Sequence, residues 1–135
     1  MTITKRKRRK RKGHYHRGTY VSSKTGLSCK FRSGWESYYM QHLDSCDDVR
    51  TWRYESFSIE YVSNVRTGKT RKYIPDFVVE YVDGTSHVVE IKPLRRTTQA
   101  IVKKKLAAAE AWCRANGMTL ELITEIELKV LGLLK

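Results

Sequence analysis

The chain has 135 residues, a mass of 15.8 kDa and 40% hydrophobic residues, a size that predicts one domain with its own buried core. No apolar run approaches the ~20 residues that span a bilayer, and the start lacks the apolar segment of a secretory signal, so we expect a soluble protein that is not exported. Its three cysteines, Cys29, Cys46 and Cys113, form no C-x-x-C pair, which argues against a disulfide framework and a zinc site.

The net charge of +13 is concentrated at the amino terminus. Residues 1–17 carry nine Lys or Arg and no acid, whereas the rest of the chain has 18 basic and 14 acidic residues. Such a segment cannot pack on itself, so we expect residues 1–16 to be a disordered basic tail that binds nucleic acid, ahead of a single domain at 17–135. A solvated tail and a nuclear localisation signal remain alternatives. The DNA-binding candidates in the tail are Lys5, Arg6, Lys7, Arg8, Arg9, Lys10, Arg11 and Lys12.

The first regular element is predicted after a stretch rich in Gly, Ser, Thr and Tyr at residues 13–30, which we interpret as an ordered arm or short irregular strand. Ser33 and Glu36 form the pattern of a capping box and predict a helix over 34–45. Apolar residues at a spacing of four, Trp35, Tyr39 and Leu43, predict that one stripe of this helix faces the core.

Three strands are predicted next. Aromatic and β-branched residues indicate strands over 51–61, with a break in alternation near Ser56, over 71–82 and over 85–92. Residues 64–70 turn the chain between the first two, and Asp83-Gly84 is a strong hairpin signal between the last two. Together they predict an antiparallel meander.

Strand parity tests whether Asp76 and Glu90 share a face. In the third strand Glu90 and Lys92 face one way. A two-residue turn would put Asp76 on the opposite face, whereas a three-residue loop over 83–85 pairs Asp76 with Lys92 and Phe77 with Ile91. We therefore predict this bulged hairpin, or an equivalent bulge at Pro75, which brings the three polar side chains together.

The last third of the chain predicts a helix over 98–116, a short strand over 120–123 and a final helix that opens at a second capping box, Thr124 to Glu127. Strand, helix and strand in succession imply a parallel crossover. The predicted order is α-β-β-β-α-β-α, an α/β fold of mixed-sheet α+β type.

Two carboxylates and a lysine on neighbouring strands point to metal-dependent cleavage of phosphodiester bonds. Mg²⁺ prefers oxygen ligands, here Asp76, Glu90 and the backbone carbonyl of Ile91, and it polarises a phosphate and acidifies a bound water. Lysine is ordinarily protonated at neutral pH, so we expect Lys92 to orient that water or to stabilise developing negative charge. An exposed Glu90–Lys92 ion pair and a turn role for Asp76 are the alternatives.

Several segments carry a family resemblance, with Asp76 and Glu90-Ile91-Lys92 at their centre. The segments Phe31–Glu36, Val49–Trp52, Tyr73–Glu80 and Val89–Pro93 resemble PD-(D/E)XK nucleases, and in particular the TnsA-type endonuclease domain of heteromeric transposases. The chain is still more similar to the small head-completion nucleases of tailed bacteriophages, a resemblance that continues through Ala108–Cys113 and Leu122–Glu125 and covers residues 30–128.

The resemblance implies a restriction-endonuclease-like core and specific roles. Asp76 and Glu90 match the metal-binding carboxylates, Lys92 the catalytic lysine, and Glu36 the acidic residue of the first helix, which would position a second metal or a metal-bound water. TnsA-type domains often carry glutamine where Glu90 stands. Glu36 as a capping residue alone remains an alternative. The expected cofactor is Mg²⁺, with Mn²⁺ as a substitute.

The expected activity is that of a Mg²⁺-dependent DNA endonuclease, phage-encoded and acting on DNA ends or branched DNA in head completion. Its alternatives are a TnsA-like or homing-type nuclease that cuts a chosen site, and a catalytically silent DNA-binding virion protein. Expected partners are DNA and either a phage capsid or portal protein or a partner subunit; no membrane is expected. We expect a monomer or homodimer in the bacterial host cytoplasm or in the virion. Further DNA-binding candidates are Arg95, Arg96, Lys103 and Lys104, which with Lys105 form either a phosphate track beside the site or a solvated helix face.

Overall fold

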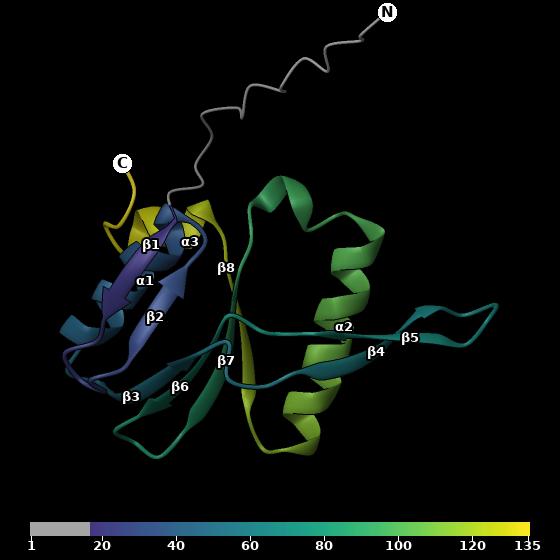
Figure 1. Ribbon diagram of the computed structural model, residues 1–135, viewed down its shortest axis with the longest axis horizontal. Helices are drawn as coiled ribbons and strands as arrows, with labels where there is room; N and C mark the ends of the chain where they lie inside the picture. Colours follow the sequence, from purple (N-terminus) through teal and green to yellow (C-terminus); the bar gives the residue numbers. More distant parts are fainter. Residues whose placement is uncertain (1–16) are drawn as a thin grey trace, which may run out of the picture.

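The computed structural model describes residues 17–135, and the basic tail predicted over 1–16 lies outside the described residues. A four-stranded mixed sheet in the order β3-β6-β7-β8 separates helices α1 and α2 (Figure 1). Two two-stranded hairpins, β1-β2 and β4-β5, lie outside this sheet. Within residues 17–135 no helix has the length and apolar character needed to cross a membrane. The elements are β1 Gly18–Val21, β2 Ser28–Phe31, α1 Gly34–Ser45, β3 Val49–Tyr54, β4 Ile59–Asn64, β5 Lys69–Tyr73, β6 Phe77–Tyr81, β7 Ser86–Ile91, the 3₁₀ helix η1 Leu94–Arg96, α2 Ala100–Ala115, β8 Thr119–Ile123 and α3 Glu125–Val130.

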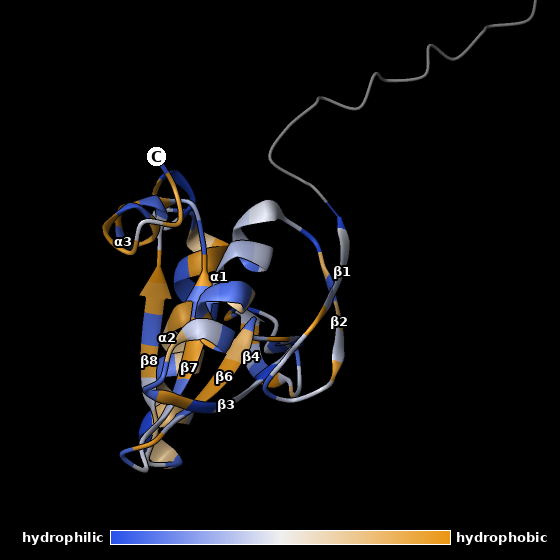
Figure 2. Ribbon diagram, turned by 90° about the vertical axis from the view of Figure 1, so that its left-hand side faces the viewer, coloured by the Kyte–Doolittle hydropathy of each residue, from blue (hydrophilic) through white to orange (hydrophobic). Residues whose placement is uncertain are grey.

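The larger hydrophobic core lies between the main sheet and α1. Figure 2 shows hydrophobic residues along β6, β7 and β8, neighbouring strands of the main sheet. The predicted stripe of α1 is confirmed, because Tyr39 and Leu43 are buried and Trp35 packs against the same cluster. Met40 of α1 is also buried in this cluster, and the buried members from the other elements are Cys29, Val49, Trp52, Phe77, Val79, Val89, Ile91, Ile123 and Leu128. Because side chains alternate along a strand, the sheet residues that do not point into this core point toward α2 on the other face.

The prediction of a continuous strand over 51–61 was wrong. β3 ends at Tyr54, Glu55 takes a left-handed φ of 47°, and β4 begins at Ile59 in a different sheet. The Glu55 N–H donates to the carbonyl of Asp76 at 2.9 Å instead of continuing a strand. The predicted break near Ser56 therefore marks the point where the chain leaves the main sheet.

The prediction of one strand over 71–82 was also wrong, because β5 ends at Tyr73 and β6 begins at Phe77. Pro75 lies between them, and its nitrogen has no hydrogen to contribute to a ladder. β4 and β5 pair with each other as a hairpin inserted between β3 and β6. β3, β6 and β7 still lie side by side, as the meander predicts.

The β6-β7 hairpin has a three-residue loop, as predicted, but two residues out of the predicted register. Phe77 pairs with Val89, not with Ile91, and the loop is residues 82–84. The Gly84 N–H donates to the Tyr81 carbonyl, and Gly84 has a φ of 90°, a conformation that glycine adopts without steric cost. A shift of two residues preserves parity, so Asp76 and Glu90 remain on the same face of the sheet.

The carboxy-terminal predictions are confirmed. α2 differs by at most two residues at either end from the predicted helix, and β8 pairs in parallel with β7. Thr124 and Glu127 form the predicted capping box at the start of α3. The buried residues of α2 are Val102, Ala109 and Cys113. All three cysteines of the chain are free thiols.

The amino-terminal arm is a β-hairpin, β1-β2, instead of an irregular strand, and it is anchored on Asp44 of α1. The Asp44 carboxylate accepts hydrogen bonds from the hydroxyls of Tyr20 and Ser22, the backbone N–H of Ser23 and the indole N–H of Trp52, at 2.6 to 2.9 Å. These bonds connect the hairpin, α1 and β3 through one side chain.

Candidate active site

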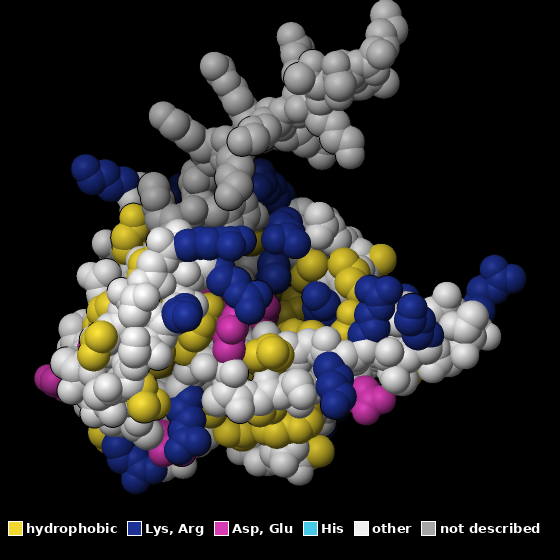
Figure 3. All heavy atoms as spheres, viewed as in Figure 1, with side chains coloured by type: hydrophobic (Ala, Val, Ile, Leu, Met, Phe, Trp, Pro, Cys, Tyr) yellow, Lys and Arg dark blue, Asp and Glu magenta, His cyan; other side chains and the backbone are white. Residues whose placement is uncertain are grey.

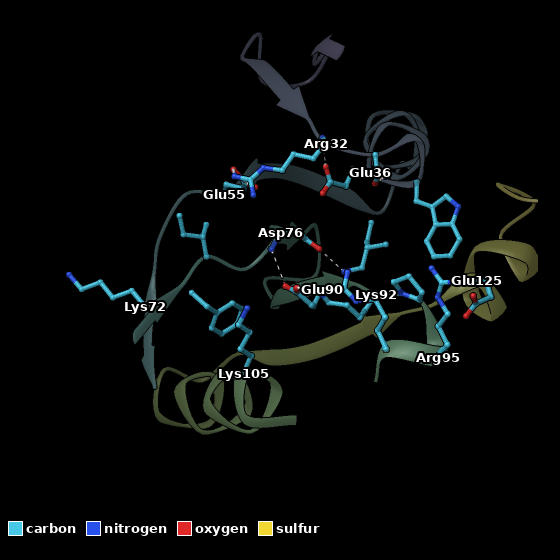
Figure 4. Close-up of a pocket in the computed structure, with 17 residues that line it drawn as sticks. Arg32, Glu36, Glu55, Lys72, Asp76, Glu90, Lys92, Arg95, Lys105 and Glu125 are labelled. Atoms are coloured by element: carbon cyan, nitrogen blue, oxygen red, sulfur yellow. Dashed lines mark hydrogen bonds and ion pairs between the residues drawn. The ribbon is translucent and has the colours of Figure 1, made fainter. Parts of the chain in front are cut away.

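A cleft of about 580 Å³ opens at the end of the main sheet where β6 begins and β7 ends. Side chains from both faces of the sheet reach it, including Glu36 of α1 and Lys105 of α2 (Figure 4). Figure 3 shows acidic side chains inside a hollow of this face, surrounded by Lys and Arg. The charged residues that line the cleft are Arg32, Glu36, Glu55, Lys72, Asp76, Glu90, Lys92, Arg95, Arg96, Lys105 and Glu125.

Asp76 and Glu90 lie next to each other at the base of the cleft. The backbone N–H of Asp76 donates to Glu90 Oε2 at 3.2 Å, and the N–H of Ile91 donates to Asp76 Oδ2 at 2.7 Å. These two bonds engage one oxygen of each carboxylate, and the second oxygen of Glu90, Oε1, faces Lys92. The predicted pairing of these carboxylates is thus confirmed by geometry, although the hairpin register that brings them together differs from the prediction.

Lys92 completes the predicted group. Its Nζ lies 3.6 Å from Glu90 Oε1, and both side chains are largely buried, with 19% and 8% of their surface exposed. Glu90 and Lys92 therefore share a face at the end of β7, as strand parity predicts. The ammonium group lies inside the cleft, where it is available to a negatively charged ligand.

Pro75 explains why a backbone oxygen is available beside these side chains. Continuing the register of β6 and β7 places Ile91 opposite Pro75. Because proline has no N–H, the Ile91 carbonyl cannot receive the ladder hydrogen bond that this position would otherwise supply. The Ile91 N–H is satisfied instead by Asp76, which orients that carboxylate. Pro75 thus leaves the Ile91 carbonyl oxygen without a ladder partner, and Asp76 is fixed in place through its carboxylate oxygen Oδ2.

Glu36 lies in the same cleft but is held by the opposite wall. Its Oε2 accepts hydrogen bonds from the Arg32 N–H at 2.8 Å and from the Tyr54 hydroxyl at 2.9 Å. The predicted capping box is only half formed, since Ser33 accepts from the Glu36 N–H but the Glu36 carboxylate binds Arg32. Glu36 is therefore oriented by two donors that do not belong to a capping box.

Burial shapes the electrostatics of the two central carboxylates. Desolvation raises the pKa of Asp76 well above its ordinary value, and the neighbouring charge of Glu90 raises it further. Burial also raises the pKa of Glu90, against the opposing effect of the Lys92 ammonium group. A cation between the carboxylates would offset both the repulsion and the desolvation.

The oxygen donors fit a hard divalent cation. Asp76, Glu90 and the Ile91 carbonyl offer two carboxylates and one backbone oxygen, and Mg²⁺ is usually held by one or two carboxylates with water completing its shell. Among residues 17–135 no group of three or more acidic, His or Cys side chains is close enough to hold an ion. A metal here would consequently depend on the backbone carbonyl and on water.

Tyr73 places a buried hydroxyl in the wall of the cleft. The side chain is only 6% exposed, and its hydroxyl has no hydrogen-bond partner among the described residues. We expect Tyr73→Phe to leave the free energy of unfolding unchanged or to raise it by up to ~1 kcal/mol, because it removes an unsatisfied polar group without creating a cavity. Chemical denaturation of the metal-free protein measures this, and a loss of more than ~1 kcal/mol would show that the hydroxyl has a partner.

The predicted DNA-binding residues separate into two groups. Arg95 and Arg96 line the cleft. Lys103 is exposed on α2 outside the cleft, and Lys104 donates from Nζ to the Ser63 carbonyl at 2.8 Å, which ties α2 to β4. The tail candidates over 5–12 lie outside the described residues.

The sequence-based site omitted Arg32, which lines the cleft, and Tyr54, which donates to Glu36, and it considered Lys105 only as part of a solvated helix face or a phosphate track. Lys105 carries a signal that was available, because it stands three residues after Val102 and four before Ala109, on the buried stripe of α2. Its charge lowers the pKa of Glu90, less than burial raises it. Arg32 and Tyr54 had no such signal, because their roles depend on contacts with Glu36 and Glu55 that only the folded chain makes.

Comparison with known proteins places the chain in a nuclease family. The family model described as TnsA-like endonuclease N terminal matches residues 46–125, which include Asp76, Glu90 and Lys92. The chain is 26% identical over 124 residues to the head completion nuclease of Enterobacteria phage T4, covering 76% of this chain and 82% of that protein. The mixed-sheet α+β architecture predicted for a restriction-endonuclease-like nuclease is the one observed. Because the family model spans more than half of its length, the chain belongs to the TnsA-like endonuclease N-terminal family of nucleases.

Proposed function

We propose that this nuclease is a Mg²⁺-dependent DNA endonuclease whose active site is built on Asp76, Glu90 and Lys92. The observation that carries the proposal is the convergence of two adjacent carboxylates, a free backbone carbonyl and a lysine in one cleft with a basic rim. The basic rim of the cleft attracts a polyanion such as DNA. A basic surface repels cations, so a bound cation depends on the two carboxylates at the base of the cleft.

Each residue has a role in hydrolysis. Asp76, Glu90 and the Ile91 carbonyl would hold the ion, and Mn²⁺ is expected to substitute for Mg²⁺. A bound Mg²⁺ supplies Lewis acidity toward the scissile phosphate and lowers the pKa of a bound water. Lys92 stabilises the negative charge that develops on the phosphate oxygens. Glu36 faces the cleft from α1 and positions a water or a second ion.

The DNA substrate is held by positive charge on several sides of the cleft. Arg95 and Arg96 of η1 are placed to contact phosphates beside the scissile bond. The sequence of the tail over 5–12 supports additional, salt-sensitive affinity for phosphates. We retain Lys103 as a peripheral phosphate contact, whereas Lys104 is already engaged by the Ser63 carbonyl.

The proposed setting is the processing of DNA ends or branched DNA during phage head completion, in the bacterial cytoplasm or in the virion. The name of the related T4 protein, head completion nuclease, supports this setting. A capsid or portal protein is then the expected partner. The family match equally favours a second candidate, a site-directed nuclease that cuts with a partner subunit as a TnsA-like enzyme. A monomer with one site would cut one strand at a time, and a homodimer both.

The test is cleavage of supercoiled plasmid, linear duplex, overhang-bearing duplex, branched duplex and single strands with Mg²⁺, Mn²⁺ or EDTA. Glu90→Gln keeps the shape of the side chain but removes its charge, and Glu110→Gln on the exposed surface of α2 is the matched control. We expect metal-dependent cutting by the wild type and the control, with loss in Glu90→Gln. If the wild type binds DNA but cuts none of these substrates with either metal, the proposal fails and a DNA-binding virion protein becomes the better description.

A further inference from the structure

The β4-β5 hairpin projects from the body of the molecule beside the cleft. Figure 1 shows it crossing α2 and extending beyond it. Its base packs against α2 through a small hydrophobic cluster that includes Ile59, Tyr61, Tyr73 and Ala109. Beyond this base, every residue from 64 to 72 is exposed. The outer part of the hairpin therefore has no core of its own, and such a ribbon contributes little to stability.

The exposed part of the hairpin carries charge of one sign. Arg66, Lys69, Arg71 and Lys72 fall within seven residues, and no acid occurs between Ser63 and Tyr73. None of the four forms an ion pair with any residue of the described range 17–135. Figure 3 shows Lys and Arg side chains on this projection as well as around the cleft. Uncompensated like charges at this density repel one another unless a polyanion binds them.

The hairpin is also fixed relative to the active site. Lys72 and Tyr73 line the cleft, and Asp76 follows only three residues later. The Lys104–Ser63 hydrogen bond of 2.8 Å attaches the middle of the hairpin to α2. Because β5 leads directly into the metal-binding segment, anything bound along the hairpin has a defined position relative to Asp76 and Glu90.

We propose that the β4-β5 hairpin is a duplex-binding arm that lies along a DNA groove on one side of the scissile phosphate. This inference rests on the proposed function and adds a substrate class, since it requires duplex beside the cut. A two-stranded β-ribbon fits the major groove of B-form DNA. The exposed apolar side chains of Val62 and Val65, 47% and 80% accessible, are suited to contacts with sugars and thymine methyl groups.

The length of the arm sets the extent of the contact. From Lys72 at the cleft to Gly68 in the turn there are four residue steps, which at about 3.3 Å each span about 13 Å. At about 3.4 Å per base pair this corresponds to about four base pairs. A single strand on that side offers no groove and would contact the same residues only through its phosphates.

Charge removal tests the arm. The variant Arg66→Ala/Lys69→Ala/Arg71→Ala is compared with Arg50→Ala/Arg114→Ala/Lys129→Ala, three exposed residues outside the hairpin and outside the cleft. Both variants keep the tail and lose three charges. Binding of the full chain to a labelled 30-base-pair duplex and to a 30-nucleotide single strand is measured by fluorescence anisotropy in EDTA over a range of salt.

We expect the hairpin variant to bind the duplex at least tenfold more weakly, with a salt slope shallower by about 2 to 3, while the control stays within about threefold of wild type. If the hairpin variant binds duplex as tightly as the wild type, the hairpin is not a DNA-binding arm. If its affinity for the single strand falls as much as its affinity for duplex, the arm is not specific for duplex. The proposed function is tested separately, by metal-dependent cutting of DNA by the wild type. If the wild type cuts DNA but the hairpin variant binds duplex as tightly as the wild type, only the proposal of the arm is wrong. If the wild type does not cut DNA but the hairpin variant binds duplex more weakly, only the proposed function is wrong.

Crosslinking gives an independent measurement of position. Val65→Cys in the turn of the hairpin and Val130→Cys on α3 are 80% and 83% exposed in the native chain, so the new thiols are matched in accessibility. Each is labelled with a photoreactive aryl azide, and the labelled wild type gives the background from the native cysteines. Crosslinks to duplex from position 65 but not from position 130 are expected, and equal yields from both would contradict the proposal.

Discussion

Replacing Lys92 with alanine is expected to lower the rate of DNA cleavage by at least about 10²- to 10³-fold while changing DNA affinity by no more than about threefold. Lys92 Nζ lies 3.6 Å from Glu90 within the cleft, so in the proposed mechanism its charge would act on the reacting phosphate, whereas most of the positive charge available for DNA lies elsewhere. Single-turnover cleavage and equilibrium binding of the same duplex measure the two effects separately.

Lys129→Ala is the control for the Lys92 substitution, since Lys129 is exposed on α3 and does not line the cleft. Lys92→Met adds a second comparison that keeps the length of the side chain without its charge, and it is expected to behave as Lys92→Ala does. Circular dichroism verifies that each variant is folded. Equal losses of cleavage and binding would contradict the assignment of Lys92 to the chemical step.

Replacing Asp44 with alanine is expected to lower the free energy of unfolding at pH 7 by about 3 kcal/mol, because four donors lose a shared charged acceptor. The largest contribution is expected from Trp52, whose side chain is 1% exposed and whose indole N–H would be left without a partner. Urea unfolding followed by tryptophan fluorescence measures the loss. Asp47→Ala, an exposed aspartate just after α1, is the control.

The effect of Asp44 is expected to depend on pH. Burial by itself would raise its pKa, but the hydrogen bonds from Tyr20, Ser22, Trp52 and Ser23 outweigh burial and lower it to about 2, below its ordinary 3.8. A folded-state pKa below the unfolded value means that the carboxylate contributes its full stability above about pH 4 and loses it between about pH 4 and 2. The difference between wild type and Asp44→Ala should therefore shrink across this interval. A difference that stays constant down to pH 2 would show that the charge of Asp44 is not responsible.

The helices and the carboxylate pair were predictable because local signals determine them. α1 begins and ends where its cap and apolar spacing place it, and the capping box of α3 and the stop of α2 at Gly117 are likewise local. The hairpin loop was shifted by two residues, yet Asp76 and Glu90 still share a face. Side chains alternate with a period of two, so an even error in register has no effect on the side to which a residue points.

The extent of the strands was not predictable, because β-propensity does not distinguish neighbouring sheets. Residues 51–61 and 71–82 each read as one strand, although Glu55 and Pro75 divide them between the main sheet and the projecting hairpin. The break at Glu55 is held by a hydrogen bond to the Asp76 carbonyl, a partner 21 positions away in the chain. No local pattern records such a contact.

The sequence by itself determined the identity of the catalytic candidates, their common face on the sheet and the strong positive charge of the chain. Those properties depend on residue type, on the two-residue period of a strand and on composition. Only the tertiary structure decided that Arg32 and Tyr54 hold Glu36, that Lys105 reaches the carboxylates from α2, and that a basic hairpin stands beside the cleft. These arrangements join elements distant in sequence, and packing between sheet and helices sets their positions.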